Sequence, residues 1–261
     1  MGLEIARSLS VGAITPNIFN YRNKYVSFGN QPADTFEPKT LDRYTTEAAI
    51  RRMIENNPKV RSIAGTFNPS LELNMEELKE LQANHATDTK NIAKGITENL
   101  PFSLQNKVDT KAIEDAAYLH DLGKVLIPKE VLNKPARLDN NEVKIMHTHS
   151  ELSYELLKNS DLNEKTLKLI RNHHQNAKRT GYPWVGKDFS ADLNLQILST
   201  ADKYSALTEN RKYKAPLTSE QALTIIYRDV QEGKLHPFVF KALVNYTAKI
   251  PQTTYDKSRL S

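Results

Sequence analysis

The sequence predicts an all-α protein, and three observations point to that fold class. From residue 73 to 249, apolar side chains recur with helical spacing in one segment after another, and no segment alternates like a strand. Helix-start signals accompany these segments: Asp139 is followed three residues later by Glu142, the spacing of a capping box. Residues 1–72 instead carry scattered glycines and prolines, so we expect a mostly irregular N-terminal arm there.

Each expected helix lies between recognisable breaks. Within the arm, residues 41–56 form a short helix that ends at Pro58. A loop containing Gly65 leads into the helical region, in which Gly123 follows an apolar run and would end the second helix. Residues 250–261 are polar and form a tail. The helices expected between residues 73 and 249 are 74–99, 109–121, 128–133, 139–158, 163–175, 190–208, 218–232 and 236–248.

Composition excludes several classes of protein. No stretch approaches the roughly 18 consecutive apolar residues of a membrane span, and the N-terminus does not resemble a secretory signal, so we expect a cytoplasmic protein without a membrane partner. The absence of cysteine removes disulfides, thiolate metal sites and cysteine nucleophiles. A net charge of +5 mildly favours anionic partners. No continuous basic stripe with interleaved aromatic residues is present, so no nucleic-acid polymer is expected as a partner.

Histidine and aspartate side chains lie on the apolar faces of five expected helices. His85 shares a stripe with Leu78 and Ile92, and His149 shares one with Leu152. His147, about 200° away from His149 on the helical wheel, faces away and is expected to be a surface residue or a hydrogen-bonded core residue. The inward-facing polar side chains are His85, His120, Asp121, His149, His173, His174 and Asp202.

A metal centre would explain these inward-facing groups. Five imidazoles and two carboxylates are more than an ordinary core holds without compensation, whereas a metal neutralises carboxylates and accepts imidazole nitrogens. Seven ligands exceed what one metal holds while keeping an open position, so we expect two metals. Asp121, adjacent to His120, is the natural bridging ligand. Nitrogen and oxygen ligands without sulfur fit iron, manganese or zinc and do not select among them.

Four segments of the chain occur in a characteristic order and spacing. They are AAYLHDLGKVLIP at 116–128, HHQNAKRTGYP at 173–183, ILSTADKYSALTENRKYK at 197–214 and EQALTIIYRDVQEGKLHPFVFKALV at 220–244. Together they resemble the HD-GYP subfamily of the HD superfamily of metal-dependent phosphohydrolases. The resemblance covers about 73–249, and no part of 1–72 is recognisable.

The resemblance implies an all-α HD-domain helical bundle with a metal centre between core helices. It implies a phosphodiesterase that opens a cyclic dinucleotide, cyclic di-GMP first, to the linear dinucleotide. The cofactors would be two divalent ions, iron or manganese first, with zinc, magnesium or nickel as alternatives. The family pattern gives one metal to His85, His120, Asp121 and Asp202, and the other to Asp121, His149, His173 and His174. The helix-face argument selects the same seven residues.

Further residues are expected to act on the substrate. Metals sharing Asp121 would hold a bridging water and lower its pKa until hydroxide is available near neutral pH. Lys124 matches the family's lysine near the scissile phosphate; it would meet developing charge or protonate the leaving oxygen. Arg211 and Lys214 match the basic residues that hold phosphate or guanine. Tyr182 would stack on a base or pack the turn.

The chain departs from the family pattern at three places. Between HH and GYP, Gln175, Lys178 and Arg179 replace the usual acidic residue and following Asp-Gly or Asn-Gly. Ser205 stands where the family has a second Asp tied to substrate. Leu81 stands where trinuclear members carry a glutamate, so we expect two metals and a reaction that can stop at the linear dinucleotide.

Two other functions and one assembly remain open from the sequence. The altered stretch after HH and the serine at 205 allow an HD phosphohydrolase acting on another nucleotide or phosphoester. The second alternative is a catalytically idle binding or regulatory module, against which the intact ligand set argues. The family often works as dimers, so a homodimer is an expected assembly.

Overall fold

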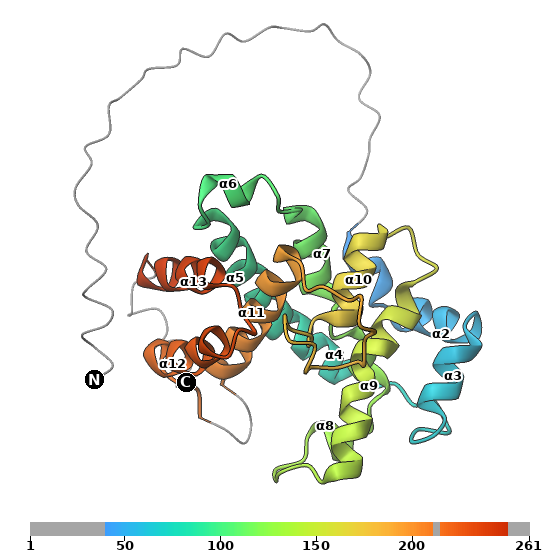
Figure 1. Cartoon of the computed structure of the whole chain (residues 1–261). Coiled ribbons are helices and arrows are strands. Elements are labelled where there is room, and N and C mark those ends of the chain that lie inside the picture. The colour runs from blue at the N-terminus through green and yellow to red at the C-terminus, as the bar shows by residue number, and fades with distance from the viewer. Residues whose placement is uncertain (1–39, 211–214, 250–261) are drawn as a thin grey trace, which may run out of the picture. The chain divides into compact units, whose positions relative to one another are not determined.

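The computed structural model describes residues 40–210 and 215–249, and every regular element within these ranges is a helix (Figure 1). The all-α prediction is therefore confirmed. The elements are the 3₁₀ turn η1 (Leu41–Tyr44), α2 (Glu47–Glu55), α3 (Pro58–Ala64), α4 (Met75–Leu81), the π turn η2 (Gln82–Ala86), α5 (Thr87–Glu98), α6 (Phe102–Gln105), α7 (Thr110–Leu119), the 3₁₀ turn η3 (Leu122–Leu126), α8 (Lys129–Leu132), α9 (Asn140–Leu157), α10 (Glu164–Asn172), α11 (Leu193–Thr208), α12 (Ser219–Gln231) and α13 (Pro237–Lys249).

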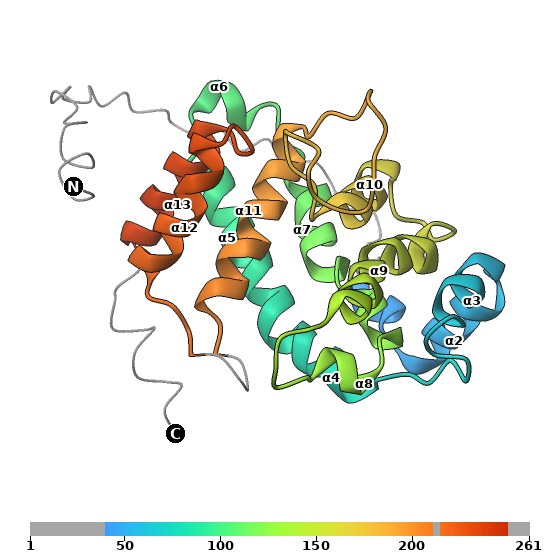
Figure 2. The same cartoon turned by 60° about the horizontal axis from the view of Figure 1, so that its bottom comes forward.

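Helix α5 is the central element of the bundle. It packs against α7, α11 and α13, and Figure 2 shows α11 beside it. Ile92 and Ile96 of α5 are buried because three neighbouring helices cover them. On the other side of α7, α10 packs against both α7 and α9, and η3 packs against α9. The ends of η2, α7 and α10 and the middles of α9 and α11 consequently face one region, which holds the candidate site.

Local capping chemistry explains where several helices begin. Asp139 accepts hydrogen bonds from the backbone N–H groups of Asn141 and Glu142, while the Glu142 carboxylate accepts from the Asp139 N–H. This reciprocal arrangement is the predicted capping box, and it begins α9. Thr218 and Gln221 form the same arrangement at the start of α12.

The sequence prediction was wrong about the chain after Pro58 and about residues 102–105. Pro58 was expected to end a helix and open a loop, but it is the first residue of α3, with Asn57 as the cap. Proline suits this position because the first helical N–H has no intrahelical partner to lose. The short helix α6 was not predicted; Pro101 is its N-cap residue.

The described part of the N-terminal arm packs onto the helical bundle. Helices α2 and α3 lie against α9. Asn57 donates its side-chain amide to the backbone oxygen of Glu155 at 2.7 Å and to its carboxylate at 3.0 Å. Residues 1–39 and 250–261 lie outside the described residues, and the domain boundary expected at residue 72 stays a prediction. In the part of the chain that the structure describes, no helix is long and apolar enough to cross a membrane.

Gly123 has a different role from the predicted one. Helix α7 ends at Leu119, before this glycine, which lies inside η3. A Cβ atom at position 123 would lie 2.2 Å from the His149 backbone oxygen and 2.7 Å from the Ser153 nitrogen. The Gly123 N–H donates to the Ser153 hydroxyl at 2.8 Å. The missing side chain therefore lets η3 approach the backbone of α9.

This close approach makes Gly123→Ala a destabilising substitution. We expect the free energy of unfolding of the metal-free protein to fall by about 1–3 kcal/mol, because a methyl group has no room between η3 and α9. Chemical denaturation measures the change. Gly186→Ala is the matched control, since a Cβ there meets no atom within 4 Å and should change stability by less than about 0.5 kcal/mol. Equal stability of the two variants would contradict the proposed contact.

Candidate metal centre

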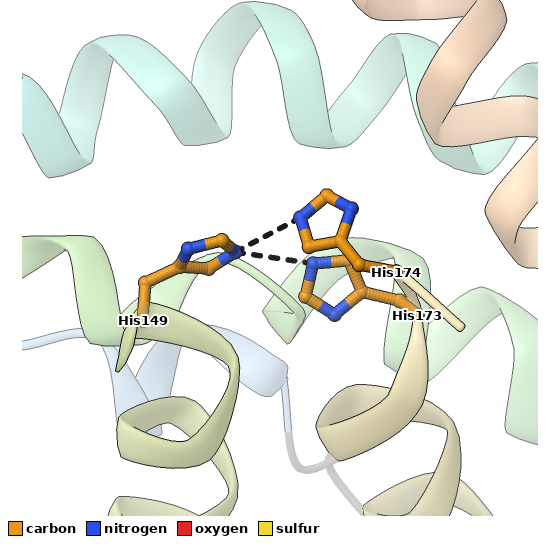
Figure 3. A group of neighbouring side chains, drawn as sticks. All are labelled: His149, His173 and His174. Atoms are coloured by element: carbon orange, nitrogen blue, oxygen red, sulfur yellow. Dashed lines mark hydrogen bonds between the residues drawn. The ribbon is translucent and has the colours of Figure 1, made fainter. Parts of the chain in front are cut away.

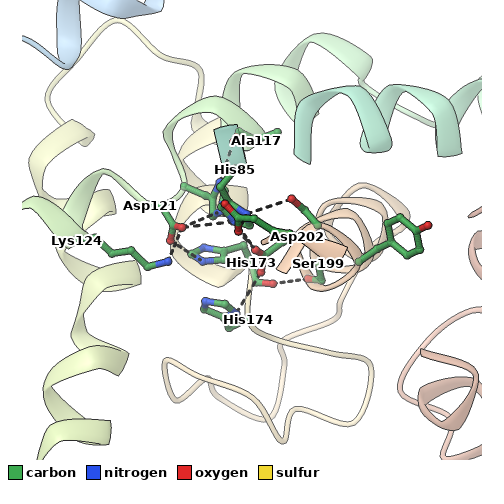
Figure 4. A network of polar contacts seen from close by, with 12 residues as sticks. His85, Ala117, Asp121, Lys124, His173, His174, Ser199 and Asp202 are labelled. Atoms are coloured by element: carbon green, nitrogen blue, oxygen red, sulfur yellow. Dashed lines mark hydrogen bonds and ion pairs between the residues drawn. The ribbon is translucent and has the colours of Figure 1, made fainter. Parts of the chain in front are cut away.

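The structure brings all seven inward-facing polar side chains into one cluster. Figure 4 labels His85, Asp121, His173, His174 and Asp202 among them. His85 comes from η2, His120 and Asp121 follow α7, and the others come from α9, the end of α10 and α11. Their side chains are at most 10% exposed, except His174 at 25%. Three triads have ligand atoms within 4.8 Å of one another: His85, His120 and Asp202; His149, His173 and His174; and His120, Asp121 and His173.

Three of the histidines are held in one tautomer by their own helices. In each, Nδ1 lies 2.6–2.8 Å from the backbone oxygen three residues earlier, and only an N–H can donate to that oxygen. The pairs are His120 with Ala117, His149 with Met146, and His173 with Ile170. The Nε2 atoms are therefore unprotonated in the neutral rings and present lone pairs to the cluster.

In the neutral rings, the Nε2 lone pairs of His149 and His173 face each other, and His174 Nε2 approaches the same point. His149 Nε2 lies 3.2 Å from His173 Nε2 and 3.1 Å from His174 Nε2 (Figure 3). Within the described part of the chain, the buried atoms His120 Nε2 and Asp121 Oδ1 have no hydrogen-bond partner. A cation would convert each of these close approaches into ligation, so the donor set fits a divalent metal.

Asp121 spans the two histidine groups. Its Oδ2 lies 3.7 Å from His85 Nε2 and 3.4 Å from His120 Nε2. Its Oδ1 lies 3.3 Å from His149 Nε2 and 4.0 Å from His173 Nε2. One oxygen thus faces each group, which is the arrangement that a bridging carboxylate needs.

Asp202 also reaches both groups, from α11. Its Oδ1 lies 3.0 Å from His85 Nε2 and 3.6 Å from His120 Nε2, and its Oδ2 lies 3.6 Å from His174 Nδ1. The family pattern assigns Asp202 to the metal of His85 and His120, with which it forms a triad; the assignment itself stays a prediction.

Charge compensation within the cluster is uneven. Burial disfavours a charged imidazole at His120, but the carboxylates of Asp121 and Asp202 outweigh burial and raise the pKa of His120 to about 10. Burial lowers the pKa of His149 to about 3 and that of His174 to about 4. Burial alone would raise the pKa of Asp121, yet His120 and Lys124 hold it well below its usual range. His120 and Lys124 thus supply positive charge beside Asp121, and the neighbouring carboxylates raise the pKa of His85 as well.

Lys124 lies at the edge of the cluster, as the family motif led us to expect. Its Nζ lies 2.5 Å from Asp121 Oδ2, and its side chain is only 16% exposed (Figure 4). It is therefore not the solvent-exposed lysine that its place after a helix would allow.

The predicted substrate-binding residues are only partly described. Arg211 and Lys214 lie outside the described residues. The Tyr182 ring stacks on the exposed His147 ring, with centroids 3.7 Å apart and planes 11° apart, and lies 4.4 Å from the His174 ring. No sequence pattern predicts the contact between Tyr182 and His147, because this contact depends on the path of the intervening loop.

Gln175 and Gly181 hold that loop against the end of α10. Gln175 is 2% exposed; its side chain donates to the Pro183 oxygen at 2.6 Å and accepts from the Gly181 N–H at 3.2 Å. A Cβ at Gly181 would lie 1.9 Å from the His174 oxygen, so only glycine allows the loop to pass there. Ser199 of α11 donates to the backbone oxygen of His173 at 2.5 Å and ties the same region to α11 (Figure 4).

Two residues near the cluster contact His85, and the sequence did not predict either contact. Ser205 Oγ lies 3.1 Å from His85 Nδ1, and Glu209 Oε2 lies 3.5 Å from the same nitrogen. Ser205 was noted only as a departure from the family pattern, and Glu209 was not singled out. Ser205 lies on α11 and Glu209 is the C-cap residue four positions later, a spacing that could have identified Glu209.

A pocket of about 410 Å³ adjoins the cluster between α11, α12 and the loop after α10. His173, His174 and Asp202 form part of its wall, and Lys203 and Lys234 also line it. Its size lies in the range of small-molecule sites, and its wall includes candidate metal ligands. A substrate in this pocket would therefore reach the cluster.

A family model described as HD domain matches residues 50–238. The chain is 36% identical over 150 residues to the cyclic di-GMP phosphodiesterase response regulator RpfG of Xanthomonas campestris pv. campestris (strain 8004), covering 55% of this chain and 38% of that protein. It is 27% identical over 260 residues to a cyclic di-GMP phosphodiesterase of Thermotoga maritima, covering 96% and 64%.

A third relative is the 3′3′-cGAMP-specific phosphodiesterase 1 of Vibrio cholerae serotype O1, which is 28% identical over 148 residues, covering 57% of this chain and 34% of that protein. The chain thus spans between about one third and two thirds of the length of these curated relatives.

The anchoring role of Gln175 can be tested with the single tryptophan, Trp184, which directly follows Pro183 and is 85% exposed. Gln175→Leu removes both hydrogen bonds to the loop, so we expect about 1–3 kcal/mol lower stability and lower Trp184 fluorescence anisotropy. Gln105→Leu is the matched control, since Gln105 of α6 likewise makes two side-chain hydrogen bonds to backbone groups, in this case to the oxygens of Glu98 and Leu100. It should lower stability without changing the anisotropy, and an unchanged anisotropy in Gln175→Leu would refute the anchoring role.

Proposed function

The chain belongs to the HD domain family, and we propose that it is a metal-dependent phosphodiesterase that hydrolyses a cyclic dinucleotide, cyclic di-GMP first, to the linear dinucleotide. The observation that carries the proposal is the pair of buried histidine groups with Asp121 between them. The names of the relatives, which are phosphodiesterases of cyclic di-GMP or 3′3′-cGAMP, support this substrate class.

Two divalent ions are the proposed cofactors, iron or manganese first, with zinc, magnesium or nickel as alternatives. When bound, such ions make water acidic enough to supply a nucleophile near neutral pH and polarise phosphoryl oxygens. The proposed ligands of the first ion are His85, His120, Asp121 and Asp202. The proposed ligands of the second ion are Asp121, His149, His173 and His174.

Lys124 is the proposed catalytic residue next to Asp121. A cationic Nζ held 2.5 Å from Asp121 Oδ2 lies where a phosphodiester beside the cluster would develop negative charge. It would stabilise this charge, or give a proton to the leaving ribose oxygen. Its low exposure supports either role, because a charge is less screened there than in open solvent.

The rest of the substrate would occupy the 410 Å³ pocket beside His174 and Asp202. Lys203, paired with Asp229 at 2.5 Å, and Lys234, paired with Glu232 at 2.6 Å, give this pocket polar walls with two lysines that could contact a phosphorylated ligand. Arg211 and Lys214 remain proposed phosphate- or base-binding residues on the strength of the family motif alone. A homodimer likewise stays a prediction.

The catalytic domain is proposed to comprise residues 73–249. All seven candidate ligands, Lys124 and the lining of the pocket come from this range. Residues 1–72 would form the N-terminal arm, of which the described helices α2 and α3 support α9 from outside the cluster.

Ser205 favours a second candidate function, hydrolysis of another nucleotide or phosphoester. The family position tied to substrate carries here a 2% exposed hydroxyl that contacts His85 Nδ1. A hydroxyl engaged in this way is not free to read a nucleobase, so the base contact of the family would be missing.

Hydrolysis by protein purified without oxygen and reloaded with Fe(II) or Mn(II) tests the function. We expect cyclic di-GMP or 3′,3′-cyclic GMP-AMP to yield linear dinucleotide, with about two ions per chain by elemental analysis. Asp121→Asn keeps the shape of the bridging residue but lowers its charge, so metal content and turnover should both fall. Two bound ions with no turnover of either dinucleotide, but with turnover of bis(p-nitrophenyl) phosphate, would favour the second candidate.

Replacing Lys124 separates its role from metal binding. Lys124→Met should lower kcat about 10²- to 10³-fold, the usual loss when one electrostatic stabiliser is removed, while the metal content stays at the wild-type value. Lys129→Met, on the neighbouring α8 with a 49% exposed side chain, is the control and should leave kcat unchanged. A kcat for Lys124→Met within threefold of wild type would exclude a catalytic role.

A further inference from the structure

His174 is the candidate ligand with the weakest local support. His120, His149 and His173 each donate Nδ1–H to a backbone oxygen of their own helix. His85 has Ser205 and Glu209 at its Nδ1 instead.

For His174, the described residues offer Nδ1 no backbone oxygen at hydrogen-bond distance, and its polar neighbour there is Asp202 Oδ2 at 3.6 Å. Its side chain is also 25% exposed, whereas the other four histidines of the cluster are at most 2% exposed. Unlike His120, His149 and His173, His174 is therefore not held by a hydrogen bond from Nδ1 to its own helix.

Three aromatic rings, His147, Tyr182 and His174, form a row that we call the ring ladder. His147 and Tyr182 are stacked, with centroids 3.7 Å apart and planes inclined by 11°. Tyr182 and His174 follow at 4.4 Å and 35°. The last ring of the ladder directs its Nε2 to within 3.1 Å of His149 Nε2, inside the cluster.

We propose that His147 and Tyr182 are positioning residues for His174, which hold its imidazole by stacking in the orientation that ligates the second metal. The proposal rests on the metal centre of the proposed function. It assigns a role to His147, which no motif marks, and of the two roles left open for Tyr182 it favours packing within the protein over stacking on a base.

Both supports of the ladder are fixed independently of His174. His147 lies on α9, two residues before the candidate ligand His149, so one helix supplies a ligand and the outer ring. Tyr182 lies in the loop that Gln175 fastens through Gly181 and Pro183. The position of His174 therefore depends, through the ring ladder, on the positions of α9 and of this loop.

Metal affinity tests the ladder directly and does not depend on which phosphoester is hydrolysed. Metal-free protein is titrated with Mn²⁺ or Zn²⁺ in competition with a chromophoric chelator, which gives a dissociation constant for each of the two ions. In His147→Ala and Tyr182→Ala, we expect the weaker ion to bind about 10- to 100-fold less tightly, the usual effect of losing a residue that orients a ligand. The tighter ion should bind as in the wild type.

Ring-retaining variants distinguish stacking from a general loss of structure. His147→Phe and Tyr182→Phe keep a flat ring, so both dissociation constants should stay within about threefold of wild type. His236→Ala is the matched control, because His236 is an exposed histidine stacked on Phe238 at 5.5 Å and 27°, apart from the cluster. It should change neither constant. Thermal unfolding of each metal-free variant checks that the fold is intact. If Tyr182→Ala is unstable, His147→Ala decides the question, because His147 is exposed and its truncation removes little core packing.

Two results would overturn the proposal. His147→Ala with both dissociation constants within twofold of wild type would make the ladder mere surface packing. Wild-type protein that binds fewer than two ions would remove the metal centre on which the ladder depends. Weaker binding of the second ion by His147→Ala, with recovery in His147→Phe, would establish it whether or not the protein turns over a cyclic dinucleotide.

Discussion

The buried carboxylate of Asp121, with imidazole lone pairs on both of its sides, is the constraint around which the protein is organised. A negative group in a helical core is strongly unfavourable unless cations surround it. Here six helical elements or their ends (η2, α7, η3, α9, α10 and α11) bring compensating or metal-ligating groups to it, and the close approach of Gly123 in η3 to α9 sets the distance between two of them. The same helices therefore bury the Asp121 carboxylate and supply the side chains around it, so a change in core packing also changes the cluster.

The histidines are oriented by two different strategies. Where the ligand lies within or at the end of a regular helix, the imidazole bonds to a carbonyl of the preceding turn, and the orientation depends only on that helix. Where the helical geometry changes, at the π turn of His85 and after α10 at His174, other elements supply the support through Ser205, Glu209 and Tyr182. Ligands of the second kind link the metal centre to α11 and to the loop that follows α10.

The sequence predicts the parts of this protein that follow from helical periodicity. Burial repeats every 3.6 residues, so a histidine such as His149 on an apolar stripe must point inward, and all seven cluster residues could be found in this way. Contacts set by the path of a loop could not: the stacking of His147 on Tyr182 joins residues 35 positions apart through a turn whose course no periodicity encodes. Pro58 and Gly123 were misread for a related reason, because a residue that can end a helix can also begin one or admit a neighbouring backbone.

The π turn at Gln82–Ala86 has a consequence for how this fold can change. An α-helix advances about 100° per residue, so one residue gained or lost within it would rotate everything beyond by that angle. A π turn absorbs such an extra residue locally, and His85 lies within it. The position of His85 thus depends on the number of residues between α4 and α5 as well as on their identity. Insertions or deletions between α4 and α5 should accordingly be tolerated far less than substitutions of Ala83 and Asn84, the exposed residues of the same turn.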